Sequence, residues 1–245
     1  MTSSQGPRPG PGRLLSATVF IGTILAIIAM AVLPLLTPAF THPALDMAGS
    51  AGQLGVQTGV AHRWSDLSVA ELVLGPGSFA FDGPDGPGAG PFYDSAERGH
   101  LADARLLLWL CLIAGAVSLL VIGGLIARAD EERRRATWRI VSRAGATAAA
   151  AVILLAVVSL VAFDALFTLF HQLFFPGGNW SFDPATQRLV QLYPFAFWQV
   201  TATAFGVLVA VLGVAAWWLG RRLGRSAPVR LEPPPSARAA PPQDR

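Results

Sequence analysis

Four long apolar runs constrain the fold of this chain more than any other feature of its sequence. They cover residues 14–37, 106–126, 144–170 and 195–219. Each reaches the roughly 20 residues that an α-helix needs to cross a hydrocarbon core of about 30 Å. Because lipid offers the backbone no hydrogen-bond partners, each run is expected to be a membrane-spanning helix. The sequence therefore predicts an all-α, polytopic membrane protein with four transmembrane helices.

The composition supports this class and excludes several others. Only 13% of the 245 residues are charged, against 53% hydrophobic, and the mean hydropathy is +0.50. An ordinary soluble domain carries about 25% charged residues, so a soluble enzyme is excluded. The single cysteine, Cys111, leaves no intrachain disulfide and no multi-cysteine metal site. No nucleotide-binding loop is present, and we expect no cofactor, nucleotide or nucleic-acid partner.

The arginines predict the orientation in the membrane. Fourteen of the eighteen lie in residues 1–13, 127–143 and 220–245, beside the apolar runs, where they would meet anionic lipid. Short arginine-rich segments stay in the cytoplasm. We therefore expect a cytoplasmic tail (1–13), a transmembrane domain (14–219) and a disordered, Arg/Pro-rich cytoplasmic tail (220–245) in a bacterial plasma membrane. The loops 38–105 and 171–194 are then outside the cell.

The first outer loop is long enough to hold structure of its own. Ser68 and Glu71 have the spacing of a capping box, which predicts a short interfacial helix that starts there and ends at Gly75. The Gly/Pro-rich residues 83–91 indicate a turn or a flexible flap. Asp94 and Glu97 form a second cap pair, which opens a helix that continues into the second span. In the second loop, residues 187–193 favour another short surface helix.

Two histidines are placed where a reaction site could form. His100 and His171 lie at the outer ends of the second and third spans. Either one alone is explained as a polar residue at the headgroup level, but together they suggest a site on one membrane face. His42 and His62 have no patterned partner in the loop and are interpreted as polar surface residues.

Several polar residues near these histidines have two interpretations each. Asp164 lies within the third run, where a carboxylate is costly and often functional; alternatively it is a protonated or hydrogen-bonded packing residue near the helix end. Asp103 and Asp183 could orient an imidazole, or simply cap a helix and a turn. Arg105 could contact phosphate headgroups or an oxyanion. A metal site is also chemically open, from side chains spaced along one helix and at the end of another: Glu97, His100, Asp103 and His171.

Short motifs around both histidines resemble a known bacterial family. They are ERGHLADAR at 97–105, FHQLFF at 170–175, WSFDP at 180–184, LYP at 192–194 and FW at 197–198. In order and placement they are similar to the lipoprotein intramolecular transacylase family, Lit, over roughly residues 14–219. The resemblance implies a substrate, the diacylglyceryl-cysteine of a bacterial lipoprotein, and an acyl transfer to the cysteine amine that gives the lyso-form. It also implies that His100 and His171 are the catalytic residues.

The residues are compatible with this chemistry. One imidazole would act as the base and the other as the acid, and the sequence leaves open which is which. The supporting residues would be Asp103, Arg105, Asp164, Trp180 and Asp183. Two other functions stay open at this point: a non-enzymatic membrane partner protein, and a membrane cytochrome with two histidine ligands to haem.

Overall fold

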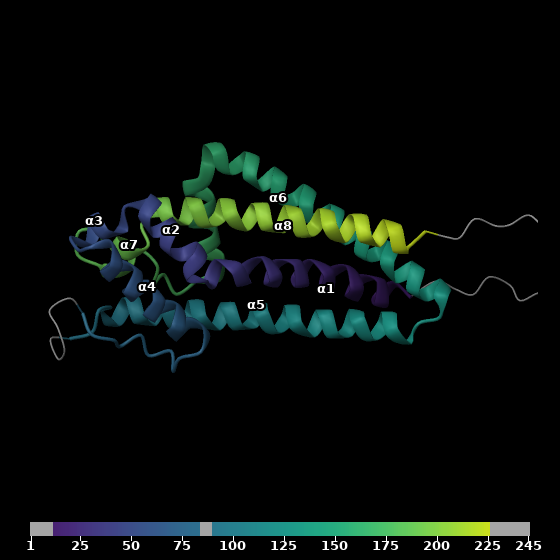
Figure 1. Cartoon of the computed structure of the whole chain (residues 1–245), viewed down its shortest axis with the longest axis horizontal. Coiled ribbons are helices and arrows are strands. Elements are labelled where there is room, and N and C mark those ends of the chain that lie inside the picture. Colours follow the sequence, from purple (N-terminus) through teal and green to yellow (C-terminus); the bar gives the residue numbers. More distant parts are fainter. Residues whose placement is uncertain (1–11, 84–89, 226–245) are drawn as a thin grey trace, which may run out of the picture.

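The computed structural model describes residues 12–83 and 90–225, and its core is a bundle of four long helices (Figure 1). These are α1 (Arg13–Val32), α5 (Ser95–Arg128), α6 (Glu131–Phe174) and α8 (Phe195–Leu223). All four are long and apolar enough to cross a membrane. Within the described ranges, the only extended pairing is an isolated bridge between Asp82 and Pro91. The predicted all-α class with four membrane-spanning helices is confirmed.

The helices are longer than the apolar runs that predict them. The first span continues past α1 into a 3-10 turn, η1 (Leu33–Leu36). α5 has 34 residues and is about 51 Å long at 1.5 Å per residue, well beyond a hydrocarbon core of about 30 Å. Its first turns therefore project beyond the apolar run. Most of the two predicted tails, and residues 84–89 of the predicted flap, lie outside the described residues.

α6 and α8 pack closely because small residues face each other across their interface. A Cβ atom added at Gly145 of α6 would lie 2.5 Å from the carbonyl oxygen of Gly213 on α8. The converse substitution at Gly213 would place a Cβ 2.8 Å from the carbonyl oxygen of Gly145. In a membrane, where apolar side chains gain nothing by leaving lipid, such close backbone contact is a main source of helix association.

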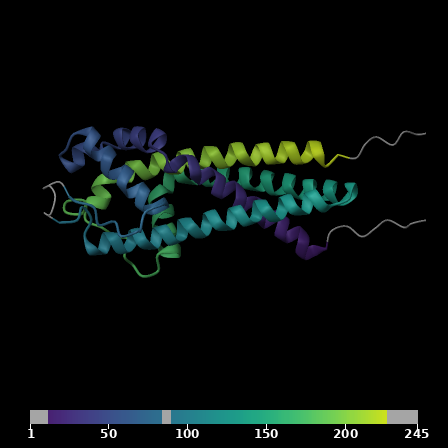
Figure 2. The same ribbon diagram turned by 60° about the horizontal axis from the view of Figure 1, so that its bottom comes forward.

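A second layer, which we call the cap, covers one end of the bundle. It consists of α2 (Pro38–Ala48), α3 (Ser50–Leu54), α4 (Thr58–Val73) and α7 (Arg188–Leu192), together with the segment that leads into α5. Figures 1 and 2 show these short helices gathered at one end, whereas α1 begins and α8 ends at the other. The prediction of short helices in the loops 38–105 and 171–194 is confirmed, including a helix within residues 187–193.

The cap has its own core, which joins aromatic rings to hydrogen-bonded hydroxyls. Tyr93 is fully buried and its hydroxyl lies 2.8 Å from Ser68 Oγ, while Tyr193 donates to Ser65 Oγ at 3.1 Å. Burial raises the pKa of Tyr93 well above its usual value and that of Tyr193 to about 12, so both phenols stay protonated. The main buried side chains are Leu45, Leu54, Trp64, Phe79, Phe92, Tyr93, Leu101, Leu189, Leu192, Tyr193 and Phe197.

The prediction that a helix starts at Ser68 is wrong. α4 begins ten residues earlier, at Thr58, and Ser68 lies inside it, where its hydroxyl donates to the carbonyl oxygen of Trp64. Glu71 does not close a capping box: its carboxylate accepts from the backbone N–H groups of Ser78 and Phe79 and caps the following turn. The face that carries Ser65 and Ser68 is buried against tyrosines, so the helix lacks the apolar periodicity that would have revealed its full length.

The predicted cap pair Asp94–Glu97 is confirmed, and Glu97 has a second role. Asp94 Oδ1 accepts from the Glu97 N–H at 2.8 Å, and Glu97 Oε2 accepts from the Asp94 N–H at 2.7 Å. The other carboxylate oxygen of Glu97 accepts from the N–H of Leu189, in the first turn of α7, at 2.6 Å. One buried carboxylate thus fixes the first turn of α5 against the loop between α6 and α8.

The α6–α8 contact predicts a sharp difference between two substitutions on α8. Gly213→Ala should lower the midpoint of thermal unfolding, because overpacking of a close contact costs about 1–3 kcal/mol. Gly206→Ala is the matched control, since its Cβ would meet Val152 at an ordinary 3.6 Å. Thermal unfolding of the purified protein in detergent measures both, and equal midpoints for the two variants would contradict the proposed packing.

The position of Glu97 predicts that its loss loosens a distant loop. In Glu97→Ala the N–H groups of Asp94 and Leu189 lose their acceptor, and hydrogen bonds to a charged group contribute about 1.5–3 kcal/mol each. Amide hydrogen exchange in peptides that cover α7 should accelerate. Glu132→Ala, an exposed carboxylate in the first turn of α6, serves as the control and should leave this exchange unchanged. Unchanged α7 exchange in Glu97→Ala would refute the bridge.

Candidate functional site

The structure brings His100 and His171 together at the cap end of the bundle. The two imidazoles come from α5 and α6, with ring centroids 5.9 Å apart and planes 24° from parallel. His171 is buried, with 8% of its surface exposed, and His100 is partly buried. We call these two residues the histidine pair.

Aromatic rings surround the histidine pair. The Phe175 ring packs on both imidazoles, with its centroid 4.5 Å from that of His100 and 5.5 Å from that of His171. The ring centroid of Trp180 lies 5.1 Å from that of His171, and the ring centroid of Phe182 lies 5.6 Å from that of His100. Such a shell excludes water and disfavours a charged imidazole, and two imidazolium ions this close would also repel each other. Both rings are therefore neutral at rest, and each has one nitrogen that can accept a proton and one that can donate.

The backbone fixes the tautomer of His171. Its Nδ1 lies 2.8 Å from the carbonyl oxygen of Phe167, one turn earlier on α6, and only a protonated Nδ1 can donate to that oxygen. The lone pair is then on Nε2. His100 differs, because its Nδ1 is buried and has no hydrogen-bond partner among the described residues. A proton on that atom would be an unsatisfied donor, which favours the His100 tautomer with its proton on Nε2.

A bend in α6 brings His171 to this position. The backbone of Ala162 is non-helical, at φ −141° and ψ 32°, and Ser159 Oγ donates to the carbonyl oxygen of Leu155 just before it. Such serine bonds often bend helices. Beyond Ala162 the end of α6 turns away from the line of the helix and passes behind α8 (Figure 1).

Asp103 and Trp180 lie beside the histidine pair. Asp103 is one turn after His100 on α5, and its Oδ2 accepts from the Asn179 amide at 2.8 Å. The structure thus pairs Asp103 with Asn179, and not with an imidazole. Sequence reasoning missed Asn179, because a polar residue after two glycines is typical of any turn.

The other three predicted supporting residues lie apart from the imidazoles. Arg105 donates to the carbonyl oxygen of Glu71 and joins α5 to the end of α4. Asp183 accepts from the Ala185 N–H and from the Thr186 hydroxyl, and so caps a turn. Asp164 is exposed on α6 and has no hydrogen bond or ion pair with any described residue. Asp183 therefore caps a turn and does not orient an imidazole.

The metal alternative loses Glu97 as a ligand, because both of its carboxylate oxygens accept from backbone N–H groups. In the described part of the chain, no three His, Cys, Asp or Glu side chains form a group that could hold a metal ion.

The interpretation of His42 and His62 as unpaired surface residues is wrong. Their rings stack on each other with centroids 4.1 Å apart. His42 Nε2 lies 2.9 Å from Asp66, and His62 Nε2 lies 2.8 Å from Asp46, so two crossed pairs join α2 to α4. The signal was a histidine followed four residues later by an aspartate in each helix, a spacing that puts both side chains on one face.

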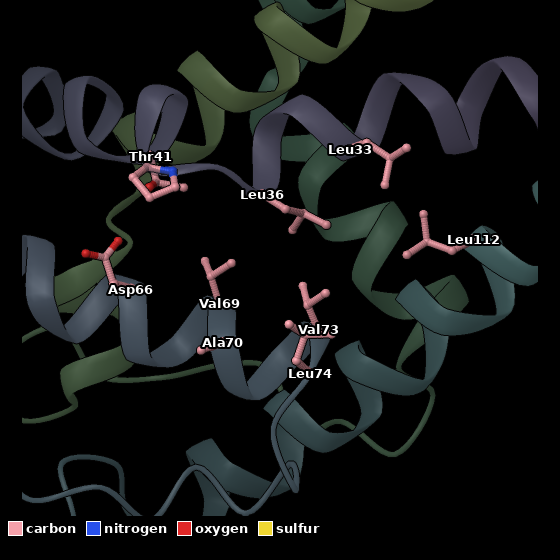
Figure 3. Close-up of a pocket in the computed structure, with 10 residues that line it drawn as sticks. Leu33, Leu36, Thr41, Asp66, Val69, Ala70, Val73, Leu74 and Leu112 are labelled. Atoms are coloured by element: carbon pink, nitrogen blue, oxygen red, sulfur yellow. The ribbon is translucent and has the colours of Figure 1, made fainter.

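A separate groove lies between α4, α5 and the end of the first span (Figure 3). Its volume is about 370 Å³, and the histidine pair is not part of its lining. Asp66 and Thr41 give one end of it a polar edge. The lining residues are Leu33, Leu36, Pro38, Thr41, Asp66, Val69, Ala70, Val73, Leu74 and Leu112.

Comparisons with known proteins place this architecture in a family. A solved structure of the membrane integral lipoprotein intramolecular transacylase Lit from Bacillus cereus superposes with a TM-score of 0.70 at 19% identity, over 86% of this chain and 94% of that chain. Two variants of that protein, with one histidine replaced by alanine or by arginine, give TM-scores of 0.62 and 0.61 at the same identity. Each superposition covers 86% of this chain; it covers 92% of the alanine variant and 91% of the arginine variant. These likenesses show the fold.

Among proteins of curated function, none matches the chain. The family model described as lipoprotein intramolecular transacylase Lit matches residues 75–198, slightly more than half of the sequence. The matched segment runs from the end of α4 to the start of α8 and contains both members of the histidine pair. The chain therefore belongs to the lipoprotein intramolecular transacylase (Lit) family.

Proposed function

We propose that this protein moves an acyl chain from the diacylglyceryl group of a bacterial lipoprotein to the α-amine of its N-terminal cysteine, giving the lyso-form. Membership of the Lit family supports a general function, that of a transacylase-like membrane protein that modifies lipoproteins. The observation that carries the specific reaction is the histidine pair, two imidazoles 5.9 Å apart at the end of a membrane-spanning bundle.

The proposed reaction is an ester-to-amide transfer within one substrate molecule. The amine nitrogen forms a bond to the ester carbonyl carbon, and the bond from that carbon to the glyceryl oxygen breaks. An α-ammonium group must lose two protons on the way: one ends on the glyceryl oxygen and the other in solvent. Because donor and acceptor share one molecule, the main requirement is a bound geometry in which the amine meets the ester.

The two imidazoles differ in a way that suggests their roles. Nε2 of His171 carries the lone pair, since its Nδ1 donates to Phe167, and is suited to take the proton from the attacking amine. His100, with its proton on Nε2, is suited to stabilise the oxyanion and to protonate the leaving glyceryl oxygen. The aromatic shell of Phe175 and Trp180 would keep water, a competing nucleophile, away from the ester.

The remaining residues support the site in different ways. Asp103 and Trp180 line its edge. Arg105 and Asp183 act through structure, by holding α5 to α4 and by capping the turn before α7. Asp164 lies two turns from His171 along α6, and we assign it no step.

We further propose that the site faces outward from a bacterial plasma membrane, with both termini in the cytoplasm. The arginine distribution supports this orientation. At the end of α8, Arg221 and Arg222 lie over the rings of Trp217 and Trp218 at 5.2 and 5.3 Å, as expected at a membrane interface. Diacylglyceryl-lipoproteins and membrane lipid would then reach the histidine pair from the outer leaflet.

The four histidines of the chain supply a test with internal controls. His100→Ala and His171→Ala should each abolish rearrangement of a reporter lipoprotein, a loss of at least about 100-fold, because each removes one acid–base group. His42→Ala and His62→Ala remove the other pair and should retain the activity. The reporter is expressed with each variant in a host that leaves lipoproteins in the diacylglyceryl form.

The readout is mass spectrometry of the N-terminal lipopeptide. The rearrangement leaves the mass unchanged, and fragment spectra show one acyl chain on the amine and one on the glycerol. If His100→Ala and His171→Ala both rearrange the reporter as the wild type does, the proposed site is wrong. A wild-type protein that is well expressed and leaves the reporter unchanged would instead favour a non-enzymatic partner.

A further inference from the structure

An amide beside the histidine pair has an unused acceptor. Asn179 follows Gly178, whose φ of 75° turns the chain, and the Asn179 amide nitrogen donates to Asp103 Oδ2 at 2.8 Å. Its other atom, Oδ1, is buried and has no hydrogen-bond partner among the described residues. Buried acceptors without a partner are rare in folded proteins and call for an explanation.

Exchanging the oxygen and nitrogen positions of the Asn179 amide does not satisfy the unpaired atom. A flipped Asn179 would place its oxygen against the carboxylate of Asp103, where two acceptors repel, and would leave buried N–H groups unpaired. Asp103 therefore fixes the amide with Oδ1 free. No described residue supplies a donor to Oδ1.

The neighbours of Asn179 indicate what that donor is. Asp103 is exposed and adds a negative charge beside the amide, and its Oδ1 is not used by Asn179. His100, one turn earlier on α5, leaves its buried Nδ1 unpaired as well. A carboxylate and two unpaired acceptors on neighbouring residues favour a group with several N–H donors and a positive charge, and a primary ammonium has three such donors.

We propose that Asp103 and Asn179 form the subsite that recognises the α-ammonium group of the substrate's N-terminal cysteine. This inference rests on the proposed function and names two residues that set its specificity. The subsite holds the amine at the edge of the histidine pair until an imidazole removes its proton. After transfer the nitrogen is a neutral amide with one N–H, so the attraction falls and the lyso-form product leaves.

Binding of a substrate analogue that cannot react tests the subsite. The probe is a cysteine lipopeptide whose two glyceryl chains are joined by ether bonds, prepared with a free amine and with an N-acetylated amine. The wild-type protein in detergent at pH 7 should bind the free-amine form at least about tenfold more tightly, since hydrogen bonds to charged groups are the strong ones. Asp103→Asn should reduce that preference to about twofold or less.

Two further variants complete the test. Asn179→Leu keeps the size of the side chain, removes the acceptor and should also lower the preference. Asp66→Asn removes a carboxylate of the cap and should keep the full preference. Loss of the preference in either folded variant supports the subsite, with size-exclusion chromatography as the check of folding.

The outcomes separate the subsite from the proposed function. Equal binding of the two probes to the wild type, or an unchanged preference in both Asp103→Asn and Asn179→Leu, overturns the subsite and leaves transacylation untouched. If the wild type binds neither probe, the proposed function itself fails, and the subsite fails with it.

Discussion

The arrangement of the site depends on the hydrogen bonds that the buried carboxylate of Glu97 accepts. It accepts two backbone N–H groups, from Asp94 at the start of α5 and from Leu189 at the start of α7. These two points are far apart in the sequence. His100 follows Glu97 by one turn on α5, and α7 ends the loop that begins just after His171. The carboxylate thus sets α5 and the second loop at a fixed separation.

The bundle divides between tight packing and an accessible end. α6 and α8 contact each other through glycines along the membrane span. Past Ala162 the last turns of α6 leave that line, and several of their apolar side chains, such as Leu169 and Leu173, are exposed. The proposed reaction on a lipid-anchored substrate requires this combination, because the frame must stay rigid while the lipid reaches the imidazoles. The cap then closes the aqueous side with a core of its own.

Sequence periodicity was sufficient for the four spans, because a membrane requires long apolar helices. The Asp94–Glu97 cap was also visible, since its spacing is local. What could not be predicted was set by contacts across the fold. Ser68 looked like a helix start but is buried against Tyr93, and His42 looked isolated but meets Asp66 from another helix. Asn179 gave no signal, because its role depends on Asp103, 76 residues earlier.

The most direct test of the central claim is whether the acyl chain stays within its own molecule. Two diacylglyceryl lipopeptides, one with light and one with isotopically heavy acyl chains, are mixed with the purified protein, and the products are weighed by mass spectrometry. Because the proposed transfer is intramolecular, N-acylated products should be entirely light or entirely heavy, each with the mass of its own substrate. Products that combine a light and a heavy chain, or an absence of any N-acylated product, would contradict this account.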